Sequence, residues 1–284
     1  MQQLTLPAPA KLNLFLHILG RRVDGYHQLQ TLFQFLDLAD DITITVRDDG
    51  KLNLLTPFAG LADCDNLAIK AAKILQSATS TSLGADISIH KCLPMGGGVG
   101  GGSSNAATVL HGLNILWQTH LSNEKLAELG LQLGADVPVF VHGQAAWAEG
   151  VGEQLTPVVL PEPWFILVKP NCHISTAEIF QHPDLTRDSD PITVAAYLQR
   201  GARNDCEAIV RKRYPEVDKV FKLLNNLAPT RLTGTGACLF AEFADKNSAE
   251  RAFKQLPDDL QAFLARGCNQ SILHKHLQSR TNSI

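Results

Sequence analysis

The stretch LPMGGGVGGGSSNAA, Leu93–Ala107, holds six glycines, all between Gly96 and Gly102. Such a run is either a flexible linker or a loop whose backbone amides close around a ligand. A linker would be bordered by polar, unstructured sequence. This run instead follows the alternating segment Ala85–His90, which predicts a strand, and precedes Ser103–Trp117, which predicts an apolar helix capped by one of its first two serines. The context is typical of a phosphate-binding loop.

Glycines let the backbone approach an anion closely, and a helix N-terminus offers unpaired N–H groups and partial positive charge. The stretch satisfies GxGxxG, but so glycine-rich a segment satisfies almost any glycine pattern, and no acidic residue ends a following strand at the distance that a dinucleotide site requires. Gly97 and Gly102 have Walker A spacing, yet Ser103 stands where that motif has lysine. A nucleoside triphosphate bound here would need Mg²⁺ and a lysine from elsewhere.

Composition narrows the class of protein. The chain has 284 residues, 45% of them hydrophobic, which favours two domains over one. The formal net charge of −3 gives no sign of a nucleic-acid partner. Apolar runs fall short of the roughly 18–20 residues of a membrane span, and MQQLTLPAPAKLNLFL lacks the order of a signal peptide. We therefore expect a cytoplasmic protein with no membrane partner.

Cysteine and histidine spacing gives no sign of a metal site. The six cysteines form no CxxC pair, and the ten histidines form no HExxH motif, so neither a zinc site nor a disulfide scaffold is predicted. The cysteines are expected to be reduced and mostly buried. The segment around His274 and His276 is expected to be a solvated tail.

Strands and helices are predicted to alternate in both halves, which favours a mixed α/β or α+β fold over a bundle or a sandwich. A segment rich in Gly, Pro and charge, Gly150–Pro163, places a domain boundary near residue 155. The expected strands are Ala10–Leu19, Thr31–Leu38, Asp41–Val46, Lys51–Leu55, Ala85–His90, Trp164–Val168, Arg231–Thr233 and Ala237–Phe243. The expected helices are Asn66–Gln76, Ser103–Trp117, Ser122–Leu133, Ser175–Phe180, Pro191–Arg200, Asn204–Arg213, Val217–Leu227 and Ala249–Gln255. Val137–Val141 and Ala145–Ala148 are short apolar pieces.

The strand Ala10–Leu19 carries two polar side chains of interest. Its residues alternate in hydrophobicity, so Lys11 and Asn13 lie on the same face of a strand that is predicted to be half-buried. Both side chains can therefore reach one site.

Three segments together resemble the GHMP kinases, small-molecule kinases that have no Walker A lysine. LPMGGGVGGGSSNAA is similar to their phosphate loop, PAPAKLNLFL (Pro7–Leu16) to their N-terminal motif, and LTGTGACLF (Leu232–Phe240) to their C-terminal glycine motif. RRVDGYHQLQTLFQFLDLAD (Arg21–Asp40) and GADVPVF (Gly134–Phe140) narrow the resemblance to the branch that acts on a CDP-linked methylerythritol. The resemblance extends from Pro7 to about residue 245.

The resemblance implies a two-domain α+β fold with the active site in the cleft between the domains. Residues 1–154 would form an N-terminal α/β ATP-binding domain, and residues 155–284 a ferredoxin-like, substrate-binding domain. The implied activity is transfer of the γ-phosphoryl group of ATP to the 2-hydroxyl of the substrate, in the non-mevalonate route to isoprenoid precursors. The alternatives are a mevalonate-type or homoserine-type GHMP kinase, and a nucleotide-binding regulator that has lost catalysis.

Two residues are the catalytic candidates by resemblance. Asp136, in GADVPVF, would accept the proton of the nucleophile, and Lys11 would lie beside it and favour the alkoxide. Each has a structural alternative. Asp136 precedes Val137-Pro138 and suits a helix N-cap, and Lys11 suits the edge of a sheet, where lysine discourages aggregation.

The remaining site residues are also carried over from the resemblance. ATP is expected to bind Pro94, Met95, Gly96, Gly97, Gly98, Val99, Gly100, Gly101, Gly102, Ser103, Ser104, Asn66 and Lys91. The substrate is expected to bind Asn13, Tyr26, His27, Thr176, Phe180, Gly234 and Gly236, with the cytosine stacked between aromatic faces. Mg²⁺ would arrive with ATP, with the hydroxyl of Ser103 or Ser104 as a further ligand. Asn66 is equally suited to cap a helix, and the chain is expected to be a monomer or a weak dimer.

Overall fold

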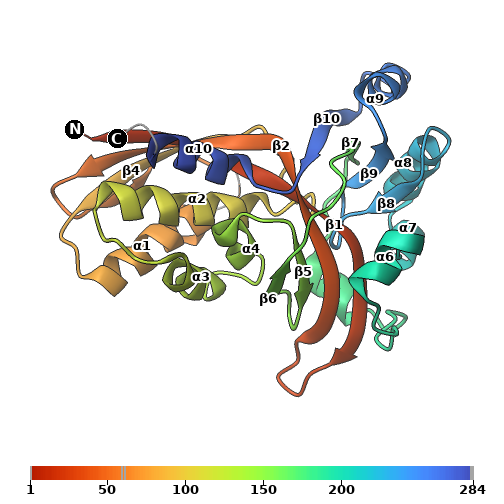
Figure 1. Ribbon diagram of the computed structural model, residues 1–284, viewed down its shortest axis with the longest axis horizontal. Coiled ribbons are helices and arrows are strands. Elements are labelled where there is room, and N and C mark those ends of the chain that lie inside the picture. Colours follow the sequence, from red (N-terminus) through yellow and green to blue (C-terminus); the bar gives the residue numbers. More distant parts are fainter. Residues whose placement is uncertain (1, 59, 61, 282–284) are drawn as a thin grey trace.

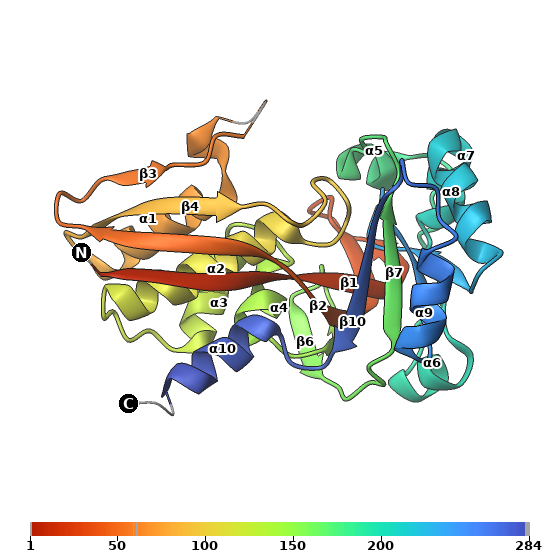
Figure 2. The ribbon, with the colours of Figure 1, turned by 90° about the horizontal axis from the view of Figure 1, so that it is seen from above.

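Two long antiparallel strands form the frame of the molecule. The computed structural model describes residues 2–58, 60 and 62–281. The strands β1 (Gln3–Arg21) and β2 (His27–Arg47) pair along nearly their whole length and run through both halves (Figures 1 and 2). Their register shifts at three places along β1, and such bulges bend a strand pair. The ribbon therefore curves from one half into the other.

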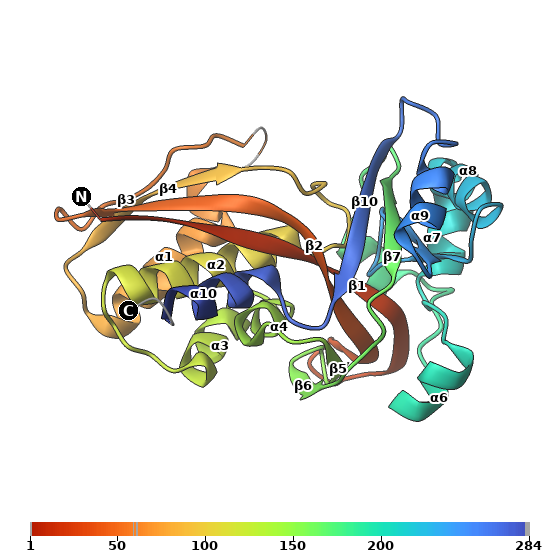
Figure 3. The ribbon, with the colours of Figure 1, turned by 45° about the horizontal axis from the view of Figure 1, so that its top comes forward.

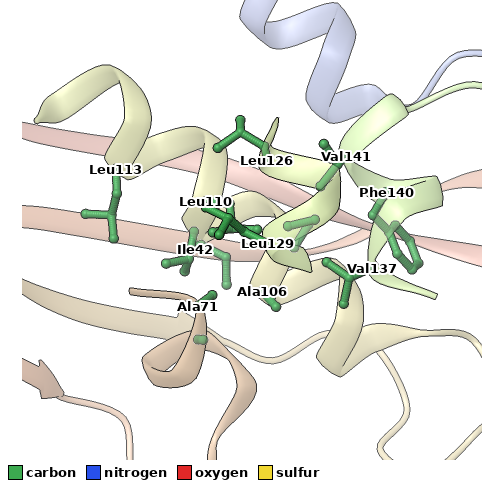
Figure 4. Close-up of a cluster of buried hydrophobic side chains, with 14 of the residues drawn as sticks. Ile42, Ala71, Ala106, Leu110, Leu113, Leu126, Leu129, Val137, Phe140 and Val141 are labelled. Carbon is green, nitrogen blue, oxygen red and sulfur yellow. The ribbon is translucent and has the colours of Figure 1, made fainter. Parts of the chain in front are cut away.

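The first half packs helices against one face of this ribbon. The strand β4 (Gly84–His90) pairs antiparallel with β2, and the short β3 (Leu52–Leu54) pairs parallel with β4. Below the sheet lie the 3₁₀ turn η1 (Asp63–Asp65) and four helices: α1 (Leu67–Thr79), α2 (Gly101–Leu116), α3 (Asn123–Leu131) and α4 (Val137–His142). Figure 4 shows Leu110, Leu126, Leu129 and Val137 converging in the buried core between α2, α3 and α4.

The second half is a ferredoxin-like unit. Its sheet has the order β10 (Gln261–Cys268), β7 (Trp164–Lys169), β9 (Leu239–Phe243) and β8 (Thr230–Leu232), all antiparallel. In chain order this is a split β-α-β-β-α-β arrangement. Five helices lie along this half, as Figure 3 shows for α7, α8 and α9: α5 (Thr176–Gln181), α6 (Val194–Arg200), α7 (Glu207–Arg213), α8 (Pro215–Asn225) and α9 (Lys246–Phe253).

Besides the strand pair, three further features lie at the connection between the halves or link them. The end of β10 pairs with the middle of β2, where Cys268 lies opposite Phe35. The small strand β5 (Ala146–Glu149) pairs with β2, and β6 (Gln154–Pro157) pairs with β5, so both widen the sheet next to the connection between the halves. The last helix, α10 (Ile272–Thr281), returns to the first half, where Leu273 packs on Leu4 and Leu6 of β1. The start of β1 and the end of α10 consequently lie on the same side of the molecule (Figure 1).

Several expectations from the sequence are corrected here. The segments 31–38 and 41–46 belong to one strand, because Ala39 and Asp40 remain paired with β1. The strand β1 is not half-buried: Lys11 and Asn13 are 2% and 4% exposed, because elements of both halves cover it. The strands β6 and β10 were not predicted.

The helix starts also differ in part. α2 begins at Gly101, and its N-cap is Gly100, whose φ of +73° suits glycine, so neither serine caps it. The apolar piece 137–141 is the helix α4. The cap expected at Asn66 is present, and Ser122 and Ser175 cap α3 and α5 in the same way, each accepting a backbone N–H. In the described part of the chain, no helix is long and apolar enough to span a bilayer.

His274 is not in a solvated tail, although His276 is exposed. The Nε2 atoms of His274 and His111 lie 2.9 and 3.0 Å from the carbonyl oxygen of Val141, and the two rings meet edge to face. Burial lowers the pKa of His111 to about 4 and also lowers that of His274. Both rings therefore stay neutral near pH 7 and can donate to Val141, which ties α10 and α2 to the end of α4.

Candidate active site

The glycine run forms a loop around a pocket of about 430 Å³. Three alternate glycines, Gly96, Gly98 and Gly100, have φ values of +64°, +74° and +73°, a region that L side chains avoid. The pocket is lined by every residue expected to bind ATP except Ser104. Ser104 is fully buried behind the loop, and its Oγ has no hydrogen-bond partner in the described structure.

Asn66 and Lys91 both line this pocket, and each already has a structural partner. The side-chain oxygen of Asn66 accepts the N–H of Ala68 and so caps α1, which fits the structural alternative. Lys91 Nζ lies 2.5 Å from Asp40 Oδ2. Both side chains are held in place at the wall of the pocket.

Asp40, which was not predicted, holds both ends of the glycine loop. Its carboxylate is 0% exposed and accepts the backbone N–H groups of Cys92 and Leu93 at 2.9 and 2.8 Å. Asn105, with its amide nitrogen facing these acceptors, donates to Asp40 Oδ2 and to the carbonyl of Gly101, both at 3.0 Å. The sequence gives no local signal for this role, because Asp40 stands in DLADD beside two other aspartates.

The C-terminal glycine motif supports the loop from the other side. Ala237 and Cys238 donate backbone N–H groups to the carbonyls of Gly96 and Gly97, at 3.3 and 3.1 Å. A side chain on Gly98 would collide with the carbonyl of Thr233. The motif therefore forms the floor of the loop, while Gly234 lines a second pocket.

That second pocket, of about 370 Å³, adjoins the first, because Gly98, Gly100 and Ser103 line both. It is bounded by β1, the start of α4, α5 and the C-terminal motif, and so lies between the two halves. Its walls include Lys11, Asn13, Asp136, Thr176, Phe180 and Gly234.

Lys11 and Asp136 form an ion pair in this pocket, with Nζ and Oδ2 3.1 Å apart. Lys11 Nζ also lies 2.5 Å from Asn13 Oδ1 and 3.3 Å from the carbonyl oxygen of Gly98. Asp136 occupies the N-cap position of α4, but its side chain caps no N–H group. Asp136 is therefore the N-cap of α4 by position, as that alternative expected, but its carboxylate makes no capping bond. The sheet-edge alternative for Lys11 is wrong, because Lys11 is buried.

The residues expected to hold the cytosine lie at the far end of β1 and β2. His27 is 9% exposed, and its ring stacks on Phe180 with centroids 5.1 Å apart. Tyr26 is 64% exposed in the turn between the strands, and neither Tyr26 nor His27 lines the 370 Å³ pocket. Thr176 Oγ1 lies 2.9 Å from Thr235 Oγ1. The structure thus pairs Phe180 with His27 and leaves Tyr26 apart.

Comparisons with known proteins agree with this arrangement. The GHMP kinases N terminal domain model matches residues 66–144, and the GHMP kinases C terminal model matches residues 182–262. The chain is 58% identical, over 98% of its length and 95% of the relative's, to the 4-diphosphocytidyl-2-C-methyl-D-erythritol kinase of Ectopseudomonas mendocina (strain ymp). The chain is 57% identical to the enzyme of the same name from Mannheimia succiniciproducens, over 96% of its own length and 90% of the relative's.

Solved structures give the same result. A crystal structure of 4-(cytidine 5'-diphospho)-2C-methyl-D-erythritol kinase superposes with a TM-score of 0.79 at 32% identity, covering 93% of this chain and 99% of that one. A mevalonate kinase superposes with a TM-score of 0.68 at 16% identity, covering 94% and 100%, which shows the fold alone. With its two matched GHMP models and these close, nearly full-length relatives, the chain belongs to the 4-diphosphocytidyl-2-C-methyl-D-erythritol kinase family of the GHMP kinases.

Proposed function

We propose that this chain transfers the γ-phosphoryl group of ATP to the 2-hydroxyl of 4-diphosphocytidyl-2-C-methyl-D-erythritol, in the non-mevalonate route to isoprenoid precursors. The observation that carries the proposal is the Lys11–Asp136 ion pair in a pocket that shares its wall with the glycine loop. A phosphoryl donor and an acceptor hydroxyl placed in adjoining pockets would meet at this pair.

The larger pocket suits ATP. Backbone N–H groups of the loop and of the first turn of α2 would hold its phosphates, as in other helix N-terminal anion sites. Lys91 would supply a positive charge beside the loop, from a strand end and not from the loop itself. Asn66 would contact the adenosine from the start of α1.

Mg²⁺ fits this site as a companion of ATP. Among residues 2–58, 60 and 62–281, no three His, Cys, Asp or Glu side chains form a cluster that could hold a metal by themselves. The triphosphate would supply most ligands, and the hydroxyl of Ser103, which lines both pockets, would be the protein ligand. An Mg²⁺ ion held in this way would supply positive charge that offsets the negative charge of the phosphates.

Asp136 and Lys11 would act on the acceptor hydroxyl. The Asp136 carboxylate is free of any capping bond and would take the proton. Lys11, held in place by Asn13 and the carbonyl of Gly98, would place a fixed positive charge where negative charge develops on oxygen. Asn13 and Gly234 would contact the methylerythritol, and Thr176, Tyr26, His27 and Phe180 the cytidine.

The test is a coupled ADP-release assay with and without Mg²⁺. It compares the CDP-linked substrate with methylerythritol phosphate, mevalonate and homoserine. We expect Mg²⁺-dependent turnover of the CDP-linked substrate alone. Equal turnover of methylerythritol phosphate would exclude the role of the cytidine site, and preference for mevalonate or homoserine would favour another GHMP kinase. Binding of ATP without any turnover would favour the nucleotide-binding regulator.

Three expectations about the whole protein stay predictions. A monomer or weak dimer would be seen by light scattering as a mass near the 30.9 kDa of the single chain at low concentration. A cytoplasmic location and a domain boundary at residue 155 are likewise carried forward from the sequence.

A further inference from the structure

The guanidinium group of Arg187 connects the end of α5 with the start of β2. One terminal nitrogen of Arg187 donates to the carbonyls of Phe180 and His182, at 2.9 and 2.8 Å, and the other to the carbonyl of Leu185, at 3.1 Å. Its Nε donates to His27 Nε2 at 3.2 Å. The carbonyls at the end of a helix lack partners within the helix, and Arg187 supplies them here. Because it makes four bonds, this side chain is fixed.

The bond from Arg187 determines which nitrogen of His27 carries the proton. A guanidinium has five N–H donors and no acceptor, and it stays charged in proteins. His27 Nε2 must therefore be the unprotonated, accepting nitrogen. Burial and then the charges of Arg187 and Arg21 lower the pKa of His27, so the ring is neutral near pH 7. A neutral ring with an unprotonated Nε2 carries its proton on Nδ1.

The proton on Nδ1 has no partner within the protein. In the described part of the chain, the hydrogen bond from Arg187 is the one bond that His27's ring makes. The His27 ring also stacks on the ring of Phe180, and the backbone carbonyl of Phe180 accepts a hydrogen bond from Arg187. One guanidinium thus fixes the donor on His27 and the position of the neighbouring aromatic ring.

We propose that Arg187 is a positioning residue that sets the tautomer of His27, so that Nδ1–H is offered to a base with a ring acceptor. Cytosine has an unprotonated N3 beside its O2, whereas uracil carries a proton on N3. An Nδ1–H donor pairs with the first and meets another donor on the second, and an unpaired donor in a closed site is costly. This inference rests on the proposed function, because that function places cytosine at His27.

The first experiment observes the tautomer directly. Histidine side-chain ¹⁵N–¹H spectra at pH 7.5, assigned with His27→Gln, are recorded for the wild type, Arg187→Met and the control Arg213→Met. Arg213 also contacts the α5 region, through Glu178, but it does not touch His27. We expect the proton on Nδ1 in the wild type and the control, and a shift toward Nε2–H in Arg187→Met. A wild-type proton on Nε2 would overturn the proposal whether or not the variant folds.

The second experiment measures base selection as kcat/KM for CDP-linked over UDP-linked methylerythritol. We expect Arg187→Met to lower this ratio at least about tenfold, the value of one hydrogen bond, mainly through KM for the CDP-linked substrate. Arg213→Met should leave it unchanged. An unchanged ratio in Arg187→Met would overturn the proposal. A wild type with the expected tautomer but no activity on either substrate would contradict the proposed function instead.

Discussion

Lys11 is nearly excluded from water, and its side chain lines the 370 Å³ pocket beside Gly98, a residue that lines both pockets. It contacts the Asp136 carboxylate, the Asn13 amide oxygen and the Gly98 carbonyl. A buried ammonium is stable only when its donors are paired, so these three oxygens also fix where its charge lies. The position of the charge is therefore set before any substrate binds.

Replacing Asp136 by Asn tests the role of its carboxylate. The amide cannot accept the proton of the hydroxyl, so we expect kcat to fall by about 10²- to 10⁴-fold. ATP binding should be nearly unchanged, because Asp136 does not line the ATP pocket. Single-turnover rates and ATP titration by calorimetry measure the two effects. If ATP affinity disappears together with activity, the role assigned to Asp136 is wrong.

Replacing Asp40 by Asn tests the connection between the loop ends. The new NH₂ group would face the ammonium of Lys91, and this partly buried charge would lose its partner. We expect a loss of about 3 kcal/mol in the free energy of unfolding and a raised KM for ATP. The matched control is Asp41→Asn, because Asp41 is exposed and lies 3.7 Å from His90. Equal effects in the two variants, by urea unfolding and steady-state kinetics, would contradict this role.

The sequence predicts some of these residues and not others, for a physical reason. Lys11 and Asn13 could be placed on one face because alternation along a strand is a local property. Asp40 and Arg187 act through partners far away in the chain, such as Leu93 and His27, and nothing near them in the sequence distinguishes them from surface charges. Their roles appear only when the fold brings these partners together.

At the scale of elements, the glycine loop depends on the C-terminal motif that lies beneath it. Gly98→Ala would force a side chain into a positive-φ position and against the carbonyl of Thr233. We expect it to lower the free energy of unfolding by about 1–3 kcal/mol and to weaken ATP binding. Gly102→Ala is the control, because its new methyl group would make only an ordinary contact with Leu67. Chemical unfolding should give a lower free energy of unfolding for Gly98→Ala than for Gly102→Ala. Equal values would argue against tight packing of the glycine loop on the C-terminal motif.

The contact of His111 and His274 with α4 predicts a dependence of stability on pH. The pKa of His111 is about 4 when folded and near 6.5 when unfolded, so between these values the unfolded chain binds a proton that the folded chain does not. Stability is then lost as the pH falls from 6.5 toward 4. Between pH 7 and pH 5, we expect the free energy of unfolding of His111→Gln to fall by about 2 kcal/mol less than that of the wild type. Urea unfolding at both pH values measures this, and parallel losses would contradict it.

The elements themselves were predicted unevenly. Segments with strong local patterns, such as the strand Gly84–His90 and the capped helix α1, lie close to their predicted positions. The strand β10 was missed because it is stabilised by partners in β7 and β2, which the local sequence does not reveal. The single long β2 was predicted as two strands because Ala39 and Asp40 interrupt its hydrophobic pattern, although pairing with β1 continues there.

At the scale of the molecule, the strand pair of β1 and β2 belongs to both halves and contributes residues to both cores. Leu16 and Ile18 of β1 belong to the core of the second half, and Ala8 belongs to the core of the first. The mixed α+β class and the two halves were predictable from alternating elements, whereas the sharing of one strand pair between two cores was not. The strand pair is shared because residues far away in the chain pack on both of its faces, and the local sequence does not reveal such contacts.

This continuity predicts cooperative unfolding. Because neither core keeps all its strands without the other, we expect both halves to unfold in one transition. Trp117 reports on the core of the first half and Trp164 on that of the second, whereas Trp147 lies in a buried cluster that both halves share. Two double variants, Trp147→Phe with Trp117→Phe and Trp147→Phe with Trp164→Phe, therefore separate the signals. Urea midpoints followed by fluorescence should coincide with each other and with circular dichroism. Two distinct midpoints would show that the halves unfold independently.

The packing of the loop on its floor has an evolutionary consequence. A side chain added at Gly97 would overlap the sulfur of Cys238, which lies buried beneath it. These two positions, distant in the chain, share one fixed volume, so an atom gained at one must be lost at the other. Gly97→Ala should be tolerated better with Cys238→Ala, which removes only the sulfur, than alone. Within lineages, the phosphate loop and the C-terminal motif are therefore expected to change together as a single inherited unit.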